Sequence, residues 1–341
     1  MGGHLTGRRV LVTGGTGFVG GHLLPVLVAA GAEVTTIARA TSDTSRLPAG
    51  VRIARADLAE GAGLREAVAG QDIVIHMAAL LFGLGWQDYL RANTRAAQNM
   101  AAALVAADAR GQGPQRVVLV SSLSASGPCD TARGRGDDAP GAPVSAYGWS
   151  KLLTETTLRG ALGDRLVTLR PPIIYGSGDR GLLPVYKGLA NGVAALPGLG
   201  AARRFPVSAI HAADMAQAIV LACLPEAHGT YHVSDGHVYT MAEFYAAAAR
   251  AIGRKPHLIP VPLWIMGLTA ALSTAAGACT RALGRRGRAP EWNMDKFREA
   301  RQCGWVGSCE RMTRELGFAP AMSLEEGMRE TIEGDRRRRL L

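Results

Sequence analysis

A glycine turn near the N-terminus constrains the fold more than any other part of the chain. An apolar run, residues 9–13, leads directly into Gly14-x-x-Gly17-x-x-Gly20, and an apolar stretch, residues 18–30, follows at once. A strand, a glycine turn and a helix in this order are typical of the first βα unit of a doubly wound sheet. Free N–H groups at the helix N-terminus there bind a dinucleotide pyrophosphate. The predicted pyrophosphate-binding residues are Gly14, Thr16, Gly17, Phe18, Val19 and Gly20.

Short apolar runs alternate with helical patterns through the first half of the chain. Such alternation is typical of a parallel sheet whose strands are joined by crossover helices. We therefore predict an α/β fold: a Rossmann-type doubly wound parallel sheet with a smaller, mostly helical C-terminal substrate cap. The predicted strands cover 9–13, 33–38, 51–55, 72–76, 115–121 and 165–170, and the predicted helices cover 64–69, 87–109 and 146–162.

The predicted domains follow from where this alternation stops. After residue 170 the chain is punctuated by proline and glycine, and from Ile210 it is expected to return to the main sheet, with a helix beginning near Ala213. The cap should cover the carboxyl ends of the strands, where open α/β sheets bind ligands. The assignment is 1–170 and 207–235 for the dinucleotide-binding domain, 171–206 and 236–335 for the cap, and 336–341 for a basic tail.

Composition restricts the compartment and the partners. The five cysteines are odd in number and form no Cys-x-x-Cys pair, and no signal peptide precedes the first strand. Both features indicate reduced thiols and a cytoplasmic location, with or without contact to a membrane. The histidines lack metal-ligand spacing, so we expect no metal site. The net charge of +10 invites a nucleic-acid hypothesis. No aromatic residues interleave the arginine clusters, which favours solvated arginines or acidic lipid instead. The clusters are Arg281, Arg285, Arg286, Arg288 and 336–339.

The most apolar segment lies between residues 258 and 283. Its part from Trp264 to Leu283 approaches the length of a membrane span and is followed by arginines, but hydroxyl residues and glycines dilute it. We expect a cap helix that lines an apolar substrate pocket. The alternative is peripheral membrane contact through 258–283, and a transmembrane helix is not expected.

The end of the second strand bears on the choice of dinucleotide. An acidic residue about 20 positions after the turn holds the adenosine ribose of NAD, but Ala38 and Arg39 occupy that place here. A guanidinium binds a 2′-phosphate, so the sequence indicates NADP(H), with NAD as the alternative. Asp57, with Leu58 after it, follows the third strand. Its carboxylate either accepts from the adenine amino group or caps a helix.

Tyr147 and Lys151 provide a candidate acid/base pair at the start of the predicted helix 146–162. Their i, i+4 spacing places the phenol and the ammonium on one helical face. An ammonium beside a phenol favours the phenolate and lowers the pKa of the phenol. Ser122 ends the fifth strand, where its hydroxyl can polarise a substrate carbonyl.

With these motifs in this order, the sequence resembles an extended short-chain dehydrogenase/reductase over essentially its whole length. The resemblance implies Tyr147 as proton donor and acceptor, Lys151 as its pKa tuner and ribose ligand, and Ser122 as carbonyl polariser. Asn93 would support a water relay, or be a plain helix residue. The other implied cofactor contacts are Ala78, Ala79, Ser121, Pro171 and Ile174, and the implied substrate contacts are Ser124, Pro172 and Tyr175.

Two substitutions favour one branch of that family. Sugar-nucleotide members usually carry an asparagine where this chain has Ile173, and a carboxylate beside the arginine that is Arg204 here. A pocket without paired donors cannot cheaply desolvate a diphosphate. Arg170-Pro-Pro-x-x-Tyr-Gly176 and the turn 231–236 are similar to the 3β-hydroxysteroid dehydrogenase and dihydroflavonol reductase-like branch. Ser126 departs from it, since an aromatic pocket wall is usual there.

These patterns predict an NADP(H)-dependent oxidoreductase that interconverts a ketone and a secondary alcohol on a small hydrophobic substrate, steroid-like, polycyclic or long-chain. The alternative is a nucleotide-sugar epimerase or dehydratase with tightly held NAD. A third hypothesis is a non-catalytic dinucleotide-sensing protein, against which the intact Ser122, Tyr147 and Lys151 set argues. A homodimer is expected from the resemblance.

Overall fold

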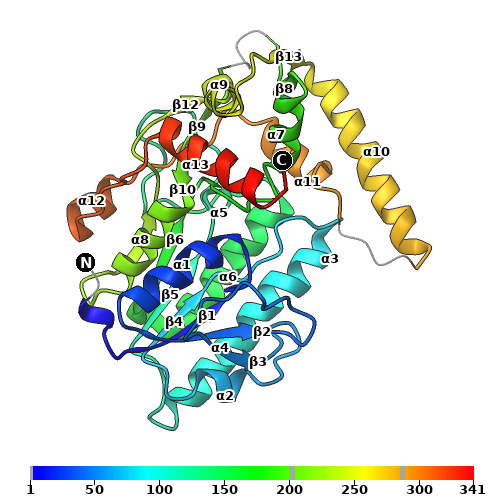
Figure 1. Cartoon of the computed structure of the whole chain (residues 1–341). Coiled ribbons are helices and arrows are strands. Elements are labelled where there is room, and N and C mark those ends of the chain that lie inside the picture. Colours follow the sequence, from blue (N-terminus) through cyan, green and yellow to red (C-terminus); the bar gives the residue numbers. More distant parts are fainter. Residues whose placement is uncertain (1–2, 200–203, 285–288) are drawn as a thin grey trace.

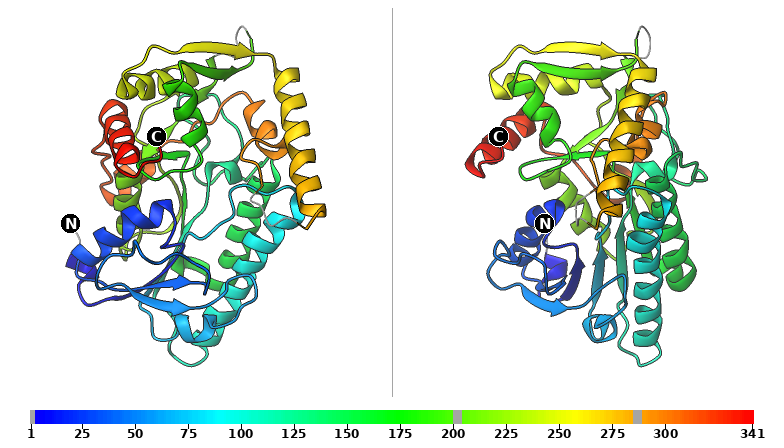
Figure 2. Two further views of the ribbon diagram at one scale, coloured as in Figure 1. Left: turned by 45° about the vertical axis from the view of Figure 1, so that its right-hand side comes forward. Right: turned by 90° about the vertical axis from the view of Figure 1, so that its right-hand side faces the viewer.

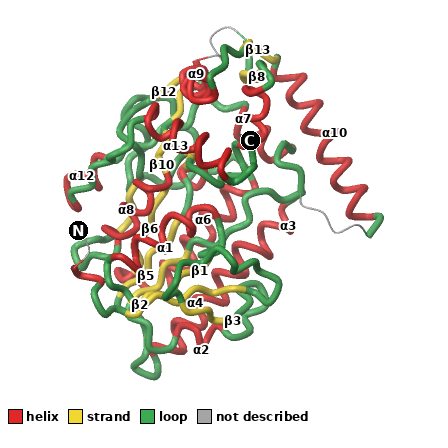
Figure 3. The backbone as a smooth tube through the Cα atoms, viewed as in Figure 1, coloured by secondary structure: helices red, strands yellow, loops and turns green. Residues whose placement is uncertain are grey.

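The computed structural model describes residues 3–199, 204–284 and 289–341. Its centre is a seven-stranded sheet in the order β11-β6-β5-β4-β1-β2-β3, in which every neighbouring pair is parallel (Figures 1 and 3). The predicted doubly wound fold is therefore confirmed. The strands are β1 (Arg9–Thr13), β2 (Glu33–Ala38), β3 (Arg52–Arg55), β4 (Ile73–His76), β5 (Arg116–Val120), β6 (Leu166–Arg170) and β11 (Gly229–His232).

Helices cover both faces of the sheet, which explains why its central strands are apolar throughout. Along β1, Val10 and Val12 face one layer and Leu11 faces the other, as the two-residue period of a strand requires. The first layer contains α1 (Phe18–Ala29) and α8 (Ala212–Ala222). The second contains α2 (Leu64–Val68), α4 (Arg95–Asp108) and α6 (Ala146–Leu162).

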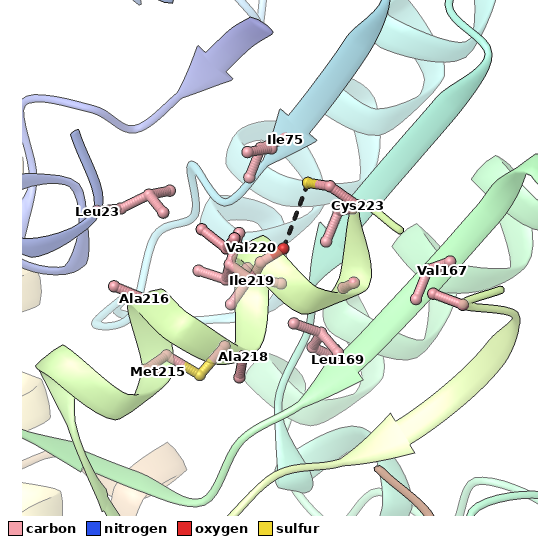
Figure 4. Close-up of a cluster of buried hydrophobic side chains, with 14 of the residues drawn as sticks. Leu23, Ile75, Val167, Leu169, Met215, Ala216, Ala218, Ile219, Val220 and Cys223 are labelled. Carbon is pink, nitrogen blue, oxygen red and sulfur yellow. Dashed lines mark hydrogen bonds between the residues drawn. The ribbon is translucent and has the colours of Figure 1, made fainter. Parts of the chain in front are cut away.

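Helix α8 packs beside α1 on this face of the sheet, against β5 and β6. Its Met215 and Ile219 belong to the same buried cluster as Leu23 of α1 and Ile75 of β4 (Figure 4). The strand before α8 does not join the main sheet as predicted from Ile210: β10 (Ala209–His211) pairs with β7 (Ile173–Tyr175) in a separate two-stranded sheet. The seventh strand of the main sheet is β11, which pairs with β6.

The cap is built from helices and short strand pairs beyond one end of the main sheet (Figures 1 and 2). Its buried core holds Tyr175, Tyr186, Phe244 and Met328. The strand pairs are β8 (Val193–Pro197) with β13 (His257–Val261) and β9 (Pro206–Val207) with β12 (Tyr239–Thr240). The helices are α7 (Leu183–Ala190), α9 (Met241–Ile252), α10 (Leu263–Ala282), α11 (Met294–Ala300) and α13 (Leu324–Arg337).

One segment assigned to the cap from sequence packs elsewhere. Helix α12 (Glu310–Leu316) places Met312 and Leu316 in the main core with Tyr231 of β11. Residues 309–318 therefore cover the edge of the nucleotide-binding domain, because their apolar side chains bury against its last strand. At the C-terminus, α13 continues to Arg337, so part of the predicted basic tail is helical. Arg285, Arg286 and Arg288 lie outside the described residues.

The predicted helix 87–109 is interrupted rather than regular. It consists of α3 (Trp86–Tyr89), a π-helical turn (Leu90–Thr94) and α4. Single π turns inside α-helices are frequent at functional sites. This one carries Asn93, whose contacts are described below.

Candidate active site

The glycine turn between β1 and α1 is shaped for close backbone approach. Gly14 has a φ of 79°, and a Cβ there would lie 2.9 Å from the Ala78 nitrogen. A Cβ on Gly20 would lie 2.4 Å from the Gly15 carbonyl oxygen. Gly15, which sequence reasoning missed, leaves room for Thr36, whose Oγ1 would be 2.2 Å from an added Cβ. Gly17 is the N-cap of α1 and no side chain caps the helix, so its first N–H groups are available to an anion.

The predicted turn residues differ in accessibility. Thr16 and Gly17 are exposed, Phe18 and Val19 are half-buried, and Gly20 is buried. The open N-terminus of α1 and the short side chains around it fit a dinucleotide. Thr16 to Val19 would hold its pyrophosphate, and a bound nicotinamide dinucleotide would supply or accept a hydride.

Thr13 joins the turn to the end of β4. Its Oγ1 lies 2.9 Å from His76 Nδ1 and accepts from the backbone nitrogens of Met77 and Ala78 at 3.2 and 3.1 Å. Burial, with repulsion from Lys151, lowers the pKa of His76 to about 3, so this histidine is neutral. The segment that contains Ala78 and Ala79 is thereby held against the glycine turn.

The structure brings the three predicted catalytic residues together at the carboxyl end of β5. Ser122 is the N-cap of α5 (Leu123–Ser126), and its hydroxyl accepts from the Ser124 nitrogen at 3.1 Å. Ser122 is also close enough to the Tyr147 phenol to lower its pKa. Lys151 is buried, and its Nζ donates to the Val120 carbonyl at 2.8 Å. A substrate oxygen between Ser122 and Tyr147 would meet two hydroxyl donors.

Lys296 of α11 is a cation at this site that sequence reasoning missed. Its Nζ lies 4.6 Å from the centre of the Tyr147 ring and 2.9 Å from Glu299 Oε2. Burial raises the pKa of Tyr147, and both Lys296 and Ser122 oppose that effect. Burial lowers the pKa of Lys151 to about 8. Lys296 therefore adds a positive charge beside the Tyr147 ring, and the role of Lys151 as pKa tuner stays a prediction.

Asp295, the neighbour of Lys296, attaches the cap to the catalytic helix. Its carboxylate accepts from the backbone nitrogens of Ala146 and Tyr147 at 2.7 and 3.0 Å. These are N–H groups of the first turn of α6, which have no partner within the helix. The position of Tyr147 thus depends on a residue almost 150 positions later in the chain. No local pattern in the sequence signals this contact.

Asn93 has a structural role here rather than that of a free ligand. Its Oδ1 accepts from the Leu80 nitrogen at 2.7 Å, and its Nδ2 donates to Ser150 Oγ at 2.9 Å. The residue is buried, and its amide therefore ties the segment after Ala79 to α6. The side chain of Asn93 therefore has no free atom for the predicted contact with the cofactor or with a water relay.

Ser121 and Ser126 likewise point into the protein. The Ser121 hydroxyl donates to the buried carboxylate of Glu155, which forms a two-point ion pair with Arg170 at 2.6 and 3.0 Å. Arg170 also donates to Ser126 Oγ at 3.2 Å, and that oxygen lies 2.6 Å from His232 Nε2. The Ser121 side chain is thus not free to bind the cofactor, and Ser126, which stands where relatives carry an aromatic pocket wall, is buried. Both bind a polar network beneath the site.

The adenosine end of the site contains a second arginine. Arg55, at the end of β3, donates from Nη1 to the Arg39 carbonyl at 2.9 Å, and the Arg39 nitrogen donates to Ser42 Oγ at 3.1 Å. Both guanidinium groups belong to exposed residues. The Asp57 carboxylate accepts from the nitrogens of Ala59 and Glu60, so it closes a turn and caps no helix. Leu58, within that turn, is half-buried against the core.

The segment after β6 provides the remaining predicted contacts. The Pro171 carbonyl accepts from the Leu123 nitrogen at 2.8 Å, which places this segment beside Ser122. Pro172, Ile174 and Ser124 are half-buried and remain accessible. Tyr175 is fully buried in the cap core, with its ring 5.7 Å from that of Phe244. A substrate cannot reach it there, and the predicted contact is wrong in this structure.

A groove of about 530 Å³ lies against the outer side of the first turn of α6. Helices α3, α10 and α11 contribute to it. The residues lining the groove include Leu84, Trp86, Val144, Trp149, Met294, Asp295 and Arg298.

Among the described residues, no group of three or more histidine, cysteine or acidic side chains could hold a metal ion.

Comparison with known proteins agrees with this site. The model of the NAD dependent epimerase/dehydratase family matches residues 10–234. The ceramide reductase of Caulobacter vibrioides is 30% identical over 334 residues, which cover 95% of this chain and 93% of that protein. The 2-alkyl-3-oxoalkanoate reductase of Stenotrophomonas maltophilia is 30% identical over 339 residues, covering 94% and 97%.

A solved structure shares the fold at lower identity. The UDP-glucose 4-epimerase of Thermus thermophilus in complex with NAD aligns with a TM-score of 0.73, at 24% identity, over 96% of this chain and 99% of that one. The family match spans the glycine turn, Ser122, Tyr147 and Lys151, and two reductases align along nearly the whole chain. This chain therefore belongs to the NAD-dependent epimerase/dehydratase family, and it is an NAD(P)-dependent oxidoreductase of the extended short-chain dehydrogenase/reductase type.

Proposed function

We propose that the protein is an NADP(H)-dependent reductase that interconverts a ketone and a secondary alcohol on a hydrophobic substrate. The observation that carries this proposal is the placement of Tyr147 at the start of α6, where the Lys296 ammonium lies 4.6 Å from the centre of its ring and Ser122, after β5, is close enough to lower the pKa of the phenol. In reduction, the Tyr147 phenol donates its proton to the substrate oxygen while Ser122 donates a hydrogen bond to it. Lys296 and Lys151 stabilise the phenolate that results.

The surroundings of the site support an apolar substrate. Ile173 and the lack of a carboxylate beside Arg204 leave no paired groups of the kind that grip a sugar nucleotide. Two relatives are named as reductases of a ceramide and of a 2-alkyl-3-oxoalkanoate, substrates with apolar chains.

The preference for NADP(H) rests on Arg39 and Arg55. Two exposed guanidinium groups at the ends of β2 and β3 can bind a 2′-phosphate, and they would meet no charged group on the ribose of NAD. We expect Arg39→Ala to weaken NADPH binding about 10- to 100-fold, the loss of one charge-assisted contact, with little effect on NADH. Arg52→Ala is a matched control, because Arg52 begins β3 and pairs with Glu33.

A titration of the protein with dinucleotides and nucleotides, followed by an activity assay, separates the proposed function from its alternatives. Protein purified from cells is titrated with NADPH and NADH by fluorescence, with UDP and dTDP run alongside, and is then offered a panel of steroid and long-chain ketones. Tighter NADPH binding and turnover of an apolar ketone support the proposal. Co-purified NAD, or firm UDP or dTDP binding, would place a nucleotide-sugar epimerase first. Dinucleotide binding without turnover of either substrate class would favour a sensing protein.

The position of Lys296 beside Tyr147 predicts how the rate of alcohol oxidation depends on pH. In that direction of the reaction, Tyr147 must accept a proton. Removing the ammonium in Lys296→Met leaves Glu299 beside the phenol and raises the pKa of Tyr147 further. Since a phenol with a higher pKa is deprotonated only at higher pH, the acidic limb of the kcat/KM profile should move up by about one pH unit. Lys187→Met, an exposed lysine of α7, should leave the limb in place. An unmoved limb in Lys296→Met would contradict the assignment.

A further inference from the structure

Helix α10 exposes its large apolar side chains, whereas an ordinary surface helix buries them. Its large apolar residues face outward: Trp264, Leu268 and Leu272 are 71%, 53% and 62% exposed, and Leu283 at its C-cap is 76% exposed. With 3.6 residues per turn, these four positions fall within an arc of about 100°. No charged residue of the helix falls within that arc. The prediction that this helix lines an apolar pocket is therefore wrong for these side chains, because they point away from the protein.

The opposite side of α10 carries small residues and contacts the protein. Ala270 is its single buried residue. A Cβ on Gly267 would lie 3.0 Å from the Phe297 ring, and one on Gly277 would lie 2.7 Å from Leu84. Soluble proteins bury the large apolar side of a surface helix and expose the polar side. An exposed apolar stripe of this length marks an interaction surface.

The helix is held in this orientation along its length. The Met294 nitrogen donates to Thr274 Oγ1 at 2.9 Å, and Trp292 Nε1 donates to Thr269 Oγ1 at 3.1 Å. Near its C-terminus, Arg281 forms a two-point ion pair with Asp88 of α3 at 2.8 and 2.9 Å. Figures 1 and 2 show α10 as a straight rod along one edge of the molecule, with its outer side uncovered. The stripe is thus presented by a fixed element.

The segment of sequence that contains α10 is basic. Between residues 244 and 290 the sequence contains seven arginines and lysines and no aspartate or glutamate. Arg254 and Lys255 precede β13 and α10 and are exposed. Two copies of this chain joined through α10 would bring these positive segments together, whereas an anionic surface would attract them.

We propose that α10 docks the protein on an anionic lipid bilayer, lying flat in the interface. The occupant must offer both hydrocarbon to the stripe and negative charge to the flanking basic residues, and acidic phospholipid offers both. By length and apolar composition, α10 could also cross a membrane. A crossing orientation would place Asp88 and Arg281 at membrane depth together with α3 and α11, which pack beside the helix, and burying those polar elements in lipid is costly. This inference does not depend on the proposed reaction.

Vesicle sedimentation of the full chain tests the proposal. We expect the protein to bind vesicles of phosphatidylcholine with about 30% phosphatidylglycerol, and to bind pure phosphatidylcholine vesicles much more weakly. Leu272→Asp should reduce the partition coefficient at least about tenfold, since a leucine contributes that much when it enters hydrocarbon. Val105→Asp makes the same kind of change on α4, at a position that is also exposed, and should bind as the unaltered protein does.

Several results would overturn the proposal. They are no binding of the unaltered protein to anionic vesicles, equal binding to both vesicle types, or equal losses in Leu272→Asp and Val105→Asp. Resistance of cellular membrane association to alkaline carbonate would instead indicate a spanning helix. Conversion of a dimer to a monomer by Leu272→Asp, without a change in vesicle binding, would assign the stripe to a second copy of the chain. Thermal melting of both variants controls for folding.

Discussion

Replacing Tyr147 by phenylalanine should lower the rate of ketone reduction about 10²- to 10⁴-fold, the usual contribution of a positioned general acid. Ser122 is close enough to the phenol to lower its pKa, and the phenylalanine ring has no proton to donate to a substrate oxygen. The ring remains, so the packing of Lys296 above it is retained and cofactor affinity should change little. The measurement is single-turnover oxidation of NADPH at a saturating concentration of ketone.

Tyr89→Phe is the matched control for this experiment. Its ring lies 6.0 Å from that of Tyr147, and its hydroxyl accepts from the Gly83 nitrogen at 2.9 Å. Because this hydroxyl is bonded to backbone groups, its loss should affect stability more than catalysis. Comparable rate losses in the two variants would show that the general acid has been misassigned.

Glu155→Gln should strongly reduce the stability of the protein. Glu155 and Arg170 are both buried, and their ion pair has two contacts, at 2.6 and 3.0 Å. Removing only the carboxylate charge leaves the Arg170 guanidinium buried without a counter-ion, which costs about 3–5 kcal/mol. The free energy of unfolding, measured in urea with the cofactor absent, should fall by this amount.

Two further variants identify the cause of this loss. Glu325 pairs with Arg250 at the surface, so Glu325→Gln should cost no more than about 1 kcal/mol. The double variant Glu155→Gln with Arg170→Met removes both buried charges and should recover much of the stability lost by the single one. Additive losses in the double variant would mean that the pair is held for packing and hydrogen bonding rather than for charge compensation.

Much of the nucleotide-binding domain can be predicted from sequence because its signals are local. The glycine turn, the buried strands and the i, i+4 spacing of Tyr147 and Lys151 depend on residues within a few turns of one another. The observed strand β2 matches its predicted bounds, and α6 covers the predicted range. These patterns also placed Ser122 at a strand end, and parallel strands carry such ends to a common edge.

The chemistry around that edge depends on contacts between distant segments. Asp295 and Lys296 of the cap contact Tyr147, and the Glu155 carboxylate accepts a hydrogen bond from the Ser121 hydroxyl. A residue type and its spacing cannot reveal which partner will satisfy a buried polar atom, since that depends on how separate segments pack. For this reason the sequence predicts a cofactor contact for Asn93, whereas the structure shows its side chain bound to protein groups.

Local patterns in the sequence were therefore enough to establish a doubly wound α/β sheet with a glycine-turn nucleotide site, since backbone conformation and side-chain period are local properties. The direction in which α10 faces depends on tertiary packing alone. Its apolar composition allows either side to be buried, and the docking of small residues such as Gly267 against Phe297 leaves the large ones outside. The same holds for Tyr175, which the folding of α13 over β7 removes from the substrate side because its ring fills the cap core.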